Sequence, residues 1–215
     1  MEYIGAVVSD VGIVKKTNQD SVCLKTACTD TKEQAAMVVL CDGMGGLAKG
    51  ELASATVVRA FSEWFEKRLP LEIQTASISD IVQEWQEIVK HINQKILQYG
   101  KASGGSMGTT LSAMFLWKGE YLVIHIGDSR IYRISYRLAQ LTEDQSFVAR
   151  EVRRGRMTKE QAQTDPRRNM LLQCIGAMDK VEPQIISGRT SPGDVFMFCS
   201  DGFWHELTEE ELYNS

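Results

Sequence analysis

The chain has 215 residues, of which 43% are hydrophobic and 24% charged, and this composition is typical of a globular protein with one core. Its net charge of −4 at pH 7 disfavours a protein that binds the nucleic-acid backbone, because such proteins display clustered positive charge. The apolar runs are too short to cross a membrane, and residues 1–12 lack the basic start and apolar core of a signal peptide. We therefore expect one cytoplasmic domain without a membrane anchor.

The cysteines predict reduced, mostly buried thiols. Their number is odd and none forms a Cys-x-x-Cys pair: Cys23, Cys28, Cys41, Cys174 and Cys199. A tyrosine-phosphatase site needs an arginine six residues after its nucleophilic cysteine, and no cysteine here has one. The sequence therefore excludes a mechanism based on a cysteine nucleophile of that kind.

The first half of the chain predicts strands followed by helices. Residues 3–9, 21–26 and 35–41 are short apolar or β-branched segments between turn-rich loops, which indicates strands. Residues 51–69 and 79–99 repeat apolar side chains at helical spacing, so each predicts an amphipathic helix that covers a sheet.

The second half predicts a return to strands. Two turns, at Lys118-Gly119 and at residues 191–193, join strand patterns, and the full set of expected strands covers residues 109–117, 121–127, 130–135, 184–189 and 194–200. Residues 142–163 are polar and permit a helix, with Thr158 and Gln161 spaced as a capping box. Strands, then two helices, then more strands indicate an α+β layered domain.

Three of the expected strands deliver an aspartate beside a glycine. The pairs are Asp42-Gly43, Asp201-Gly202 and Gly127-Asp128. A carboxylate at a strand end is held rigidly, while a glycine lets the backbone turn and bring a carbonyl to the same ion. An ordinary turn explains any one pair. Three of them, together with Asp20, form an acidic cluster that needs cations, and oxygen-only donors favour Mg²⁺ or Mn²⁺ over Zn²⁺.

The chain carries a series of short motifs in a fixed order. They are Gly12-x-x-Lys15-x-x-Asn18-Gln19-Asp20, Asp42-Gly43-Met44-Gly45-Gly46, Gly108-Thr109-Thr110, Gly127-Asp128-Ser129-Arg130, Leu141-Thr142-x-Asp144-x-Ser146, Asn169-Met170-Leu171, Ile175-Gly176 and Cys199-Ser200-Asp201-Gly202. The ordered set resembles the bacterial branch of the PPM (type 2C) metal-dependent protein serine/threonine phosphatases. This resemblance implies one catalytic domain over residues 1–215, built as a four-layer sandwich of two antiparallel β-sheets flanked by α-helices, with a flap at about 147–168.

The resemblance also implies a centre of two Mn²⁺ or Mg²⁺ ions and a weaker third ion. By the family's pattern Asp42 bridges both ions, the Gly43 carbonyl binds the second and Asp201 the first. Asp128 then helps to hold the third ion, and Asp20 orients metal-bound water. A bridging metal-bound hydroxide attacks the phosphorus of phosphoserine or phosphothreonine, with no covalent enzyme intermediate.

Several positions depart from the family's pattern. Lys15 stands where an arginine usually grips the phosphate, so we expect a catalytic, substrate-binding contact that is weaker than a bidentate one. Gln19 replaces a frequent glutamate, and Met44 and Leu47 stand where histidines occur. The chain ends before the motif that carries the family's last metal-binding aspartate. From this we expect weak binding of the first metal, low activity and an exposed strand edge.

The expected partners are phosphoproteins, among them a serine/threonine kinase and its substrates. Within the flap, Arg150, Arg153, Arg154 and Arg156 either contact acidic phosphopeptides or form a solvated surface. A catalytically weak PPM-fold module that binds phosphoproteins remains the alternative function. A nucleotide phosphate loop at Gly100-Lys101 is disfavoured, because Ala102 occupies the position that needs serine or threonine.

Overall fold

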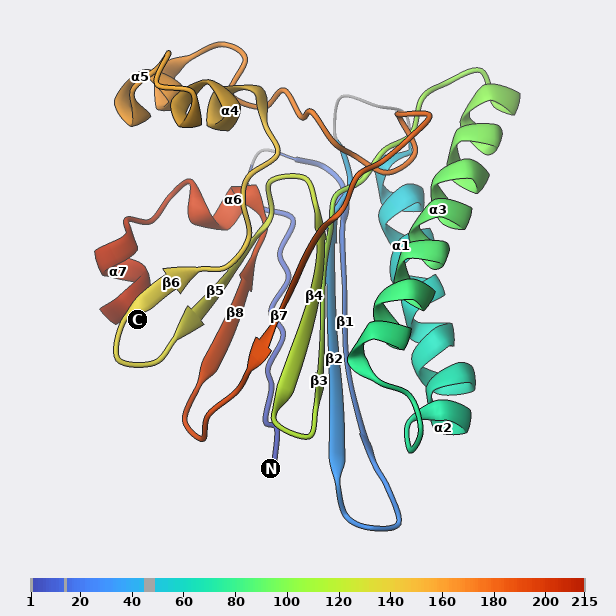
Figure 1. Ribbon diagram of the computed structural model, residues 1–215. Helices are drawn as coiled ribbons and strands as arrows, with labels where there is room; N and C mark the ends of the chain where they lie inside the picture. The colour runs from blue at the N-terminus through green and yellow to red at the C-terminus, as the bar shows by residue number, and fades with distance from the viewer. Residues whose placement is uncertain (1, 14, 45–48, 215) are drawn as a thin grey trace.

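The computed structural model describes residues 2–13, 15–44 and 49–214. Two antiparallel sheets lie face to face, one with the strand order β1-β2-β3-β4-β7 and one with the order β6-β5-β8 (Figure 1). The strands are β1 Asp20–Cys28, β2 Gln34–Asp42, β3 Leu111–Trp117, β4 Glu120–Ile126, β5 Arg130–Ile134, β6 Leu138–Gln140, β7 Gln184–Arg189 and β8 Val195–Cys199. The predicted α+β class with two antiparallel sheets is confirmed.

Two long helices, α1 and α3, run side by side over one face of the larger sheet (Figure 1). The helical segments are α1 Gly50–Glu63, the π-helical turn η1 Trp64–Arg68, α2 Leu69–Glu72, α3 Ile78–Ala102, α4 Phe147–Arg153, α5 Lys159–Thr164, α6 Asp201–Trp204 and α7 Glu209–Asn214. In the part of the chain that the structure describes, no helix combines the length and the hydropathy needed to span a membrane.

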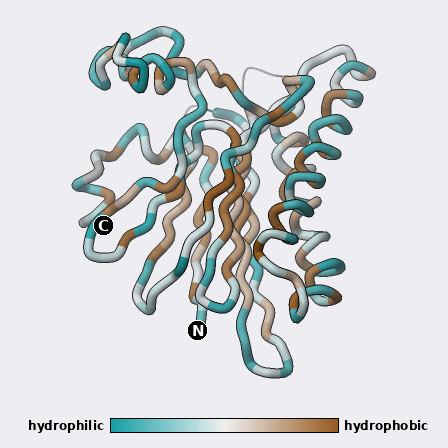
Figure 2. The backbone as a smooth tube through the Cα atoms, viewed as in Figure 1, coloured by the Kyte–Doolittle hydropathy of each residue, from teal (hydrophilic) through white to brown (hydrophobic). Residues whose placement is uncertain are grey.

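The main core lies between the larger sheet and these helices. Alternate residues of the central strands point toward the helices, as the two-residue period of a strand requires. They include Met37, Val39 and Cys41 of β2, all buried. Phe115 of β3 meets an edge-to-face cluster of aromatic rings made by Phe61, Trp64 and Trp85, with ring centroids 5.0 to 6.4 Å apart. Figure 2 shows this apolar concentration along the central strands, with hydrophilic residues on the outer helix faces.

The intervening residues of the same strands face the second sheet. Met114 of β3 and Val123 of β4 are fully buried there, and Ile131 of β5 with Phe196 and Phe198 of β8 packs against them from the smaller sheet. On the outer side of the smaller sheet, Leu212 of α7 is buried with residues of β5 and β8. The layers therefore run from α1 and α3 through the two sheets to α6 and α7.

Local signals in the sequence account for several turns and caps. Lys118 and Gly119 both have positive φ, 50° and 78°, which matches the two central residues of a tight type I′ hairpin turn. Thr158 and Gln161 form the predicted capping box at α5. Ser77 and Asp80 form another at α3, which places the start of that helix at Ile78.

Two predicted elements need correction. The predicted strand at residues 3–9 is wrong, because the segment pairs with no backbone among the described residues: Tyr3 donates its N–H to the Gln34 side chain, but Ile4 and Val8 are more than nine-tenths exposed. The predicted helix at 51–69 is interrupted by η1. The short elements α2, β6 and α6 were not predicted.

Candidate active site

Asp42 is the last residue of β2 and lies opposite Asp20, the first residue of β1. Directly paired residues of antiparallel strands project from the same face of the sheet, so the two carboxyl groups are neighbours. The Asp42 backbone is fixed on both sides. Its N–H donates to Thr110 Oγ1 at 2.9 Å, and its carbonyl accepts from Thr109 Oγ1 and from Thr110 N–H, each at 2.9 Å.

Gly43 lies where three segments of backbone meet. Its N–H donates to the Gln19 carbonyl at 3.1 Å. A Cβ at this position would lie 2.5 Å from the Gly50 carbonyl oxygen and 2.6 Å from the Gln19 oxygen. Only glycine fits at this position, because the backbones next to β1, at the end of β2 and at the start of α1 lie so close together. This close packing fixes the direction of the chain just after Asp42.

Asp201 reaches the same place from the other sheet. The strand β8 ends at Cys199, one residue before the predicted end at residue 200, and Asp201 is the first residue of α6. A side-chain hydrogen bond links its carboxyl group to that of Asp42. The Ser200 hydroxyl donates to Asp20 Oδ2 at 2.8 Å. Asp20, Asp42 and Asp201 therefore converge at one end of the two sheets.

Asp128 follows β4 and is 8% exposed. Gly127, just before it, has a φ of +113°, and a Cβ there would lie 2.6 Å from the Thr110 side chain. Glycine is therefore required for both its backbone conformation and the space around it. Thr110 Oγ1 also lies 3.0 Å from the Ser129 hydroxyl, so one threonine side chain supports the segments that carry Asp42 and Asp128.

The acids share a buried environment in which negative charge and burial outweigh the nearby positive charges of Lys15 and Arg130. Burial, and then the charges of Asp20 and Asp201 and the hydrogen bond to Asp201, raise the pKa of Asp42 to about 9. Burial, followed by the charges of Asp201 and Asp144, raises the pKa of Asp128 to about 7. Without an added cation, protons must therefore neutralise part of the cluster at neutral pH.

The donors fit a hard divalent cation. Across residues 2–13, 15–44 and 49–214, no three side chains of His, Cys, Asp or Glu gather closely enough to enclose an ion by themselves. Mg²⁺ commonly keeps several waters and takes one or two carboxylates. The Asp42 and Asp201 carboxyl groups, already close enough to share a proton, match that requirement, and a cation between them would replace the proton.

Lys15 contributes positive charge to the same region. Its side chain is exposed, and its charge lowers the pKa of Asp42, against the larger effects of burial and of the neighbouring acids. The motif residues Gly45, Gly46 and Leu47 lie outside the described residues.

The buried histidine and cysteine next to the acids support the structure and carry no charge there. His125 is fully buried between the Ser112 hydroxyl at 2.9 Å and the Gly127 carbonyl at 3.1 Å, and burial lowers its pKa to about 4, so it supports the turn before Asp128 as a neutral ring. His91 and His205 are exposed. Cys41 is buried next to Asp42, and burial raises its pKa well above the ordinary value, which makes it a poor nucleophile.

The segment 147–168 forms α4 and α5 beside this end of the sheets (Figure 1). Its arginines are largely paired within the segment: the Glu151 carboxylate lies 3.1 Å from Arg150, 3.9 Å from Arg154 and 3.6 Å from Arg156. Arg153 lies 3.4 Å from Glu143. These pairs favour a self-supporting basic surface over a set of free arginines.

Known proteins with similar sequences indicate the activity of this acidic site. The family profile described as protein phosphatase 2C matches residues 13–215. The chain belongs to the protein phosphatase 2C family. It is similar to the serine/threonine phosphatase stp of Listeria monocytogenes, with 30% identity over 208 residues that cover 95% of this chain and 79% of the relative.

Two solved structures share the fold. Serine/threonine phosphatase Stp1 from Staphylococcus aureus superposes with a TM-score of 0.83 and 29% identity, covering 95% of this chain and 78% of the other. The catalytic domain of the phosphatase PstP, solved with two manganese ions, has a TM-score of 0.78 and 29% identity over 96% of this chain and 81% of the other. The prediction of a metal-dependent protein serine/threonine phosphatase is confirmed at the level of enzyme class.

Sequence reasoning missed the residues that hold the acids in place. Thr109 and Thr110 were identified only as part of a motif, yet they fix the Asp42 backbone. Ser200 was noted only as the neighbour of Asp201, although its hydroxyl reaches Asp20, 180 positions away in the chain. The sequence signal that could have identified these supporting residues is a serine or threonine within a motif that also belongs to the predicted site.

Proposed function

We propose that the chain removes phosphate from phosphoserine and phosphothreonine in proteins at the acidic end of the two sheets, by metal-assisted attack of water without a covalent enzyme intermediate. One observation carries the proposal: the buried Asp42 carboxyl is close enough to Asp201 to share a proton and has a pKa raised to about 9. Such a pair is costly to keep unless a cation occupies it.

Each acid then has a role toward the cations. Asp42 would serve as a ligand to two ions, Asp201 and the Gly43 carbonyl would each hold one of them, and Asp128 with Asp201 would hold a weaker third. When bound, Mn²⁺ or Mg²⁺ would make water a stronger nucleophile near neutral pH and would offset negative charge on the phosphoryl oxygens.

The remaining groups orient water and substrate. Asp20, whose Oδ2 accepts a hydrogen bond from Ser200, would orient the attacking water. Lys15 is the phosphate contact, a mobile point charge on an exposed side chain. We assign residues 1–215 to one catalytic domain, with 147–168 as the segment beside the substrate.

The substrates follow from the family: phosphoproteins, including those made by a serine/threonine kinase. The alternative of a catalytically weak phosphoprotein-binding module is disfavoured by the family, whose named relatives are phosphatases.

Phosphate release from a phosphothreonine peptide tests the proposal. We expect turnover with millimolar Mn²⁺ or Mg²⁺, none in excess chelator, and no loss after alkylation of the exposed Cys28. Asp201→Asn should abolish turnover, whereas Asp30→Asn, which removes an exposed carboxylate in the β1–β2 hairpin, should not. Full activity in chelator, or inactivation by the alkylating agent alone, would contradict the proposal.

A further inference from the structure

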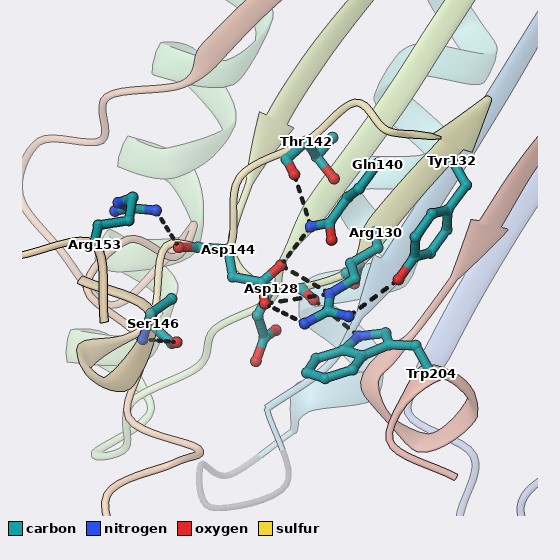
Figure 3. A network of polar contacts seen from close by, with 12 residues as sticks. Asp128, Arg130, Tyr132, Gln140, Thr142, Asp144, Ser146, Arg153 and Trp204 are labelled. Atoms are coloured by element: carbon teal, nitrogen blue, oxygen red, sulfur yellow. Dashed lines mark hydrogen bonds and ion pairs between the residues drawn. The ribbon is translucent and has the colours of Figure 1, made fainter. Parts of the chain in front are cut away.

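Arg130, the first residue of β5, is the centre of a polar network next to Asp128 (Figure 3). Its Nε donates to Asp144 Oδ1 at 3.0 Å and its Nη2 to Asp144 Oδ2 at 2.7 Å, which is a bidentate pair. Its Nη1 donates to the Tyr132 hydroxyl at 3.0 Å. With one carboxylate and one hydroxyl satisfied by this fork, and only 20% of the side chain exposed, little of it remains for a substrate phosphate.

The face of the same guanidinium lies on Trp204, the last residue of α6. The guanidinium carbon is 3.4 Å from the centroid of the ring, which is a close cation–π contact. The indole Nε1 donates to the backbone carbonyl of Asp128 at 3.1 Å. The chain from Asp128 to Arg130, the stacked side chains and this hydrogen bond therefore form a closed ring.

This ring of contacts joins the segment that carries Asp128 to the helix α6, which carries Asp201, and the negative charges of these two acids repel each other. The charge of Asp201 is one of the causes that raise the pKa of Asp128, so the two carboxyl groups lie within electrostatic reach. Asp201 and Trp204 are the two ends of α6, a helix of four residues whose N-cap side chain, Ser200, makes no capping bond. So short a helix has little stability of its own and takes its position from its contacts.

We propose that Arg130 and Trp204 are positioning residues that hold Asp128 and Asp201 at the separation a divalent cation requires. The inference rests on the proposed function, because it takes these two acids as ligands. Neither positioning side chain touches the cation. Residues that orient metal ligands in this way typically change metal affinity by 10–100-fold when they are replaced.

The test is calorimetric titration of Mn²⁺ into the full chain. We expect Trp204→Leu, which removes both the stacking face and the N–H donor, to raise the Kd of the Mn²⁺ site that needs Asp128 by about 10-fold. Trp204→Phe keeps an aromatic face for Arg130 and loses the indole N–H donor, so its Kd for Mn²⁺ should lie between the values of the parent and of Trp204→Leu. Trp117→Phe is the matched control, because Lys118 lies over that ring at 5.2 Å at the opposite end of the sheet.

A double variant separates positioning from general stability. In the Asp128→Asn background, where that site is already lost, Trp204→Leu should cause no further change in Mn²⁺ binding, since residues that act through one another are not additive. Arg130→Lys, which keeps the charge and loses the fork, should weaken binding in the same way as Trp204→Leu.

Two results would overturn the inference. One is a Trp204→Leu chain that binds Mn²⁺ as the parent does. The other is an equal loss of affinity with and without Asp128, which would mean that the network acts through overall stability. A parent chain that binds no Mn²⁺ would remove the proposed function itself and this inference with it, whereas a parent that binds and hydrolyses beside an unaffected Trp204→Leu would remove only the inference.

Discussion

The raised pKa of Asp42 predicts an unusual dependence of stability on pH in the metal-free protein. The folded chain keeps this proton until about pH 9, whereas an unfolded aspartate releases it near pH 3.9. Between these values the folded state binds one proton more than the unfolded state, so the free energy of unfolding falls as the pH rises. One retained proton corresponds to a slope of about 1.4 kcal/mol per pH unit.

Denaturant unfolding in chelator, measured between about pH 7.5 and about pH 8.5, isolates this effect. His125, with a pKa of about 4, has completed its titration below that window in both folded and unfolded chains, and the pKa of Asp128, about 7, lies below it. We expect the parent to lose about 1.4 kcal/mol over this window relative to Asp42→Asn, in which the titrating group is absent. Saturating Mn²⁺ should remove the difference, since a cation replaces the proton. Equal slopes in the parent and in Asp42→Asn would refute the reasoning.

Three further predictions concern single residues of the site. Asp42→Ala and Asp201→Ala should each abolish phosphate release while melting no lower than the parent in chelator, because clustered acids destabilise the metal-free fold; a large fall in melting temperature would make these aspartates structural. Lys15→Arg should lower KM for a phosphopeptide with a similar or higher kcat, since a guanidinium holds phosphate through two hydrogen bonds, and an unchanged KM would remove Lys15 from the phosphate site. Gly43→Ala should lower the free energy of unfolding by about 1–3 kcal/mol and reduce activity, because its Cβ would lie 2.5 Å from the Gly50 carbonyl, and an unaltered melting curve would show that the segments separate easily.

The strands were predictable wherever a strand has a partner and a buried face. The predicted strand at 184–189 has the bounds of β7, and the hairpin turn at Lys118-Gly119 lies where its sequence placed it. Residues 3–9 show the same apolar character but form no strand. Sequence pattern reports the preference of a segment and not the presence of a neighbour with free backbone groups.

The interruption of the first long helix had no usable signal. Residues 64–68 contain no glycine or proline that would mark a break, and in the π-helical turn they adopt, Trp64 and Phe65 are both buried in the core that includes Trp85. That choice depends on the packing of distant side chains, which a pattern along one helix does not contain.

In the site, the sequence identified the acids more readily than their supports. Asp42 and Asp128 stand beside glycines whose conformation or close contacts the structure explains. The stack of Arg130 on Trp204 joins residues that are 74 positions apart, and neither residue type is unusual by itself. Contacts of this kind depend on how the two sheets face each other, and they become visible only once the fold is known.

The most direct test of the metal-centred account is a manganese anomalous difference map from a crystal of this chain grown with Mn²⁺ at a concentration that supports full turnover. The account predicts peaks within coordination distance of the carboxylate oxygens of Asp42 and Asp201, and their loss in Asp42→Asn. A crystal of active protein with no peak beside either carboxylate would contradict it.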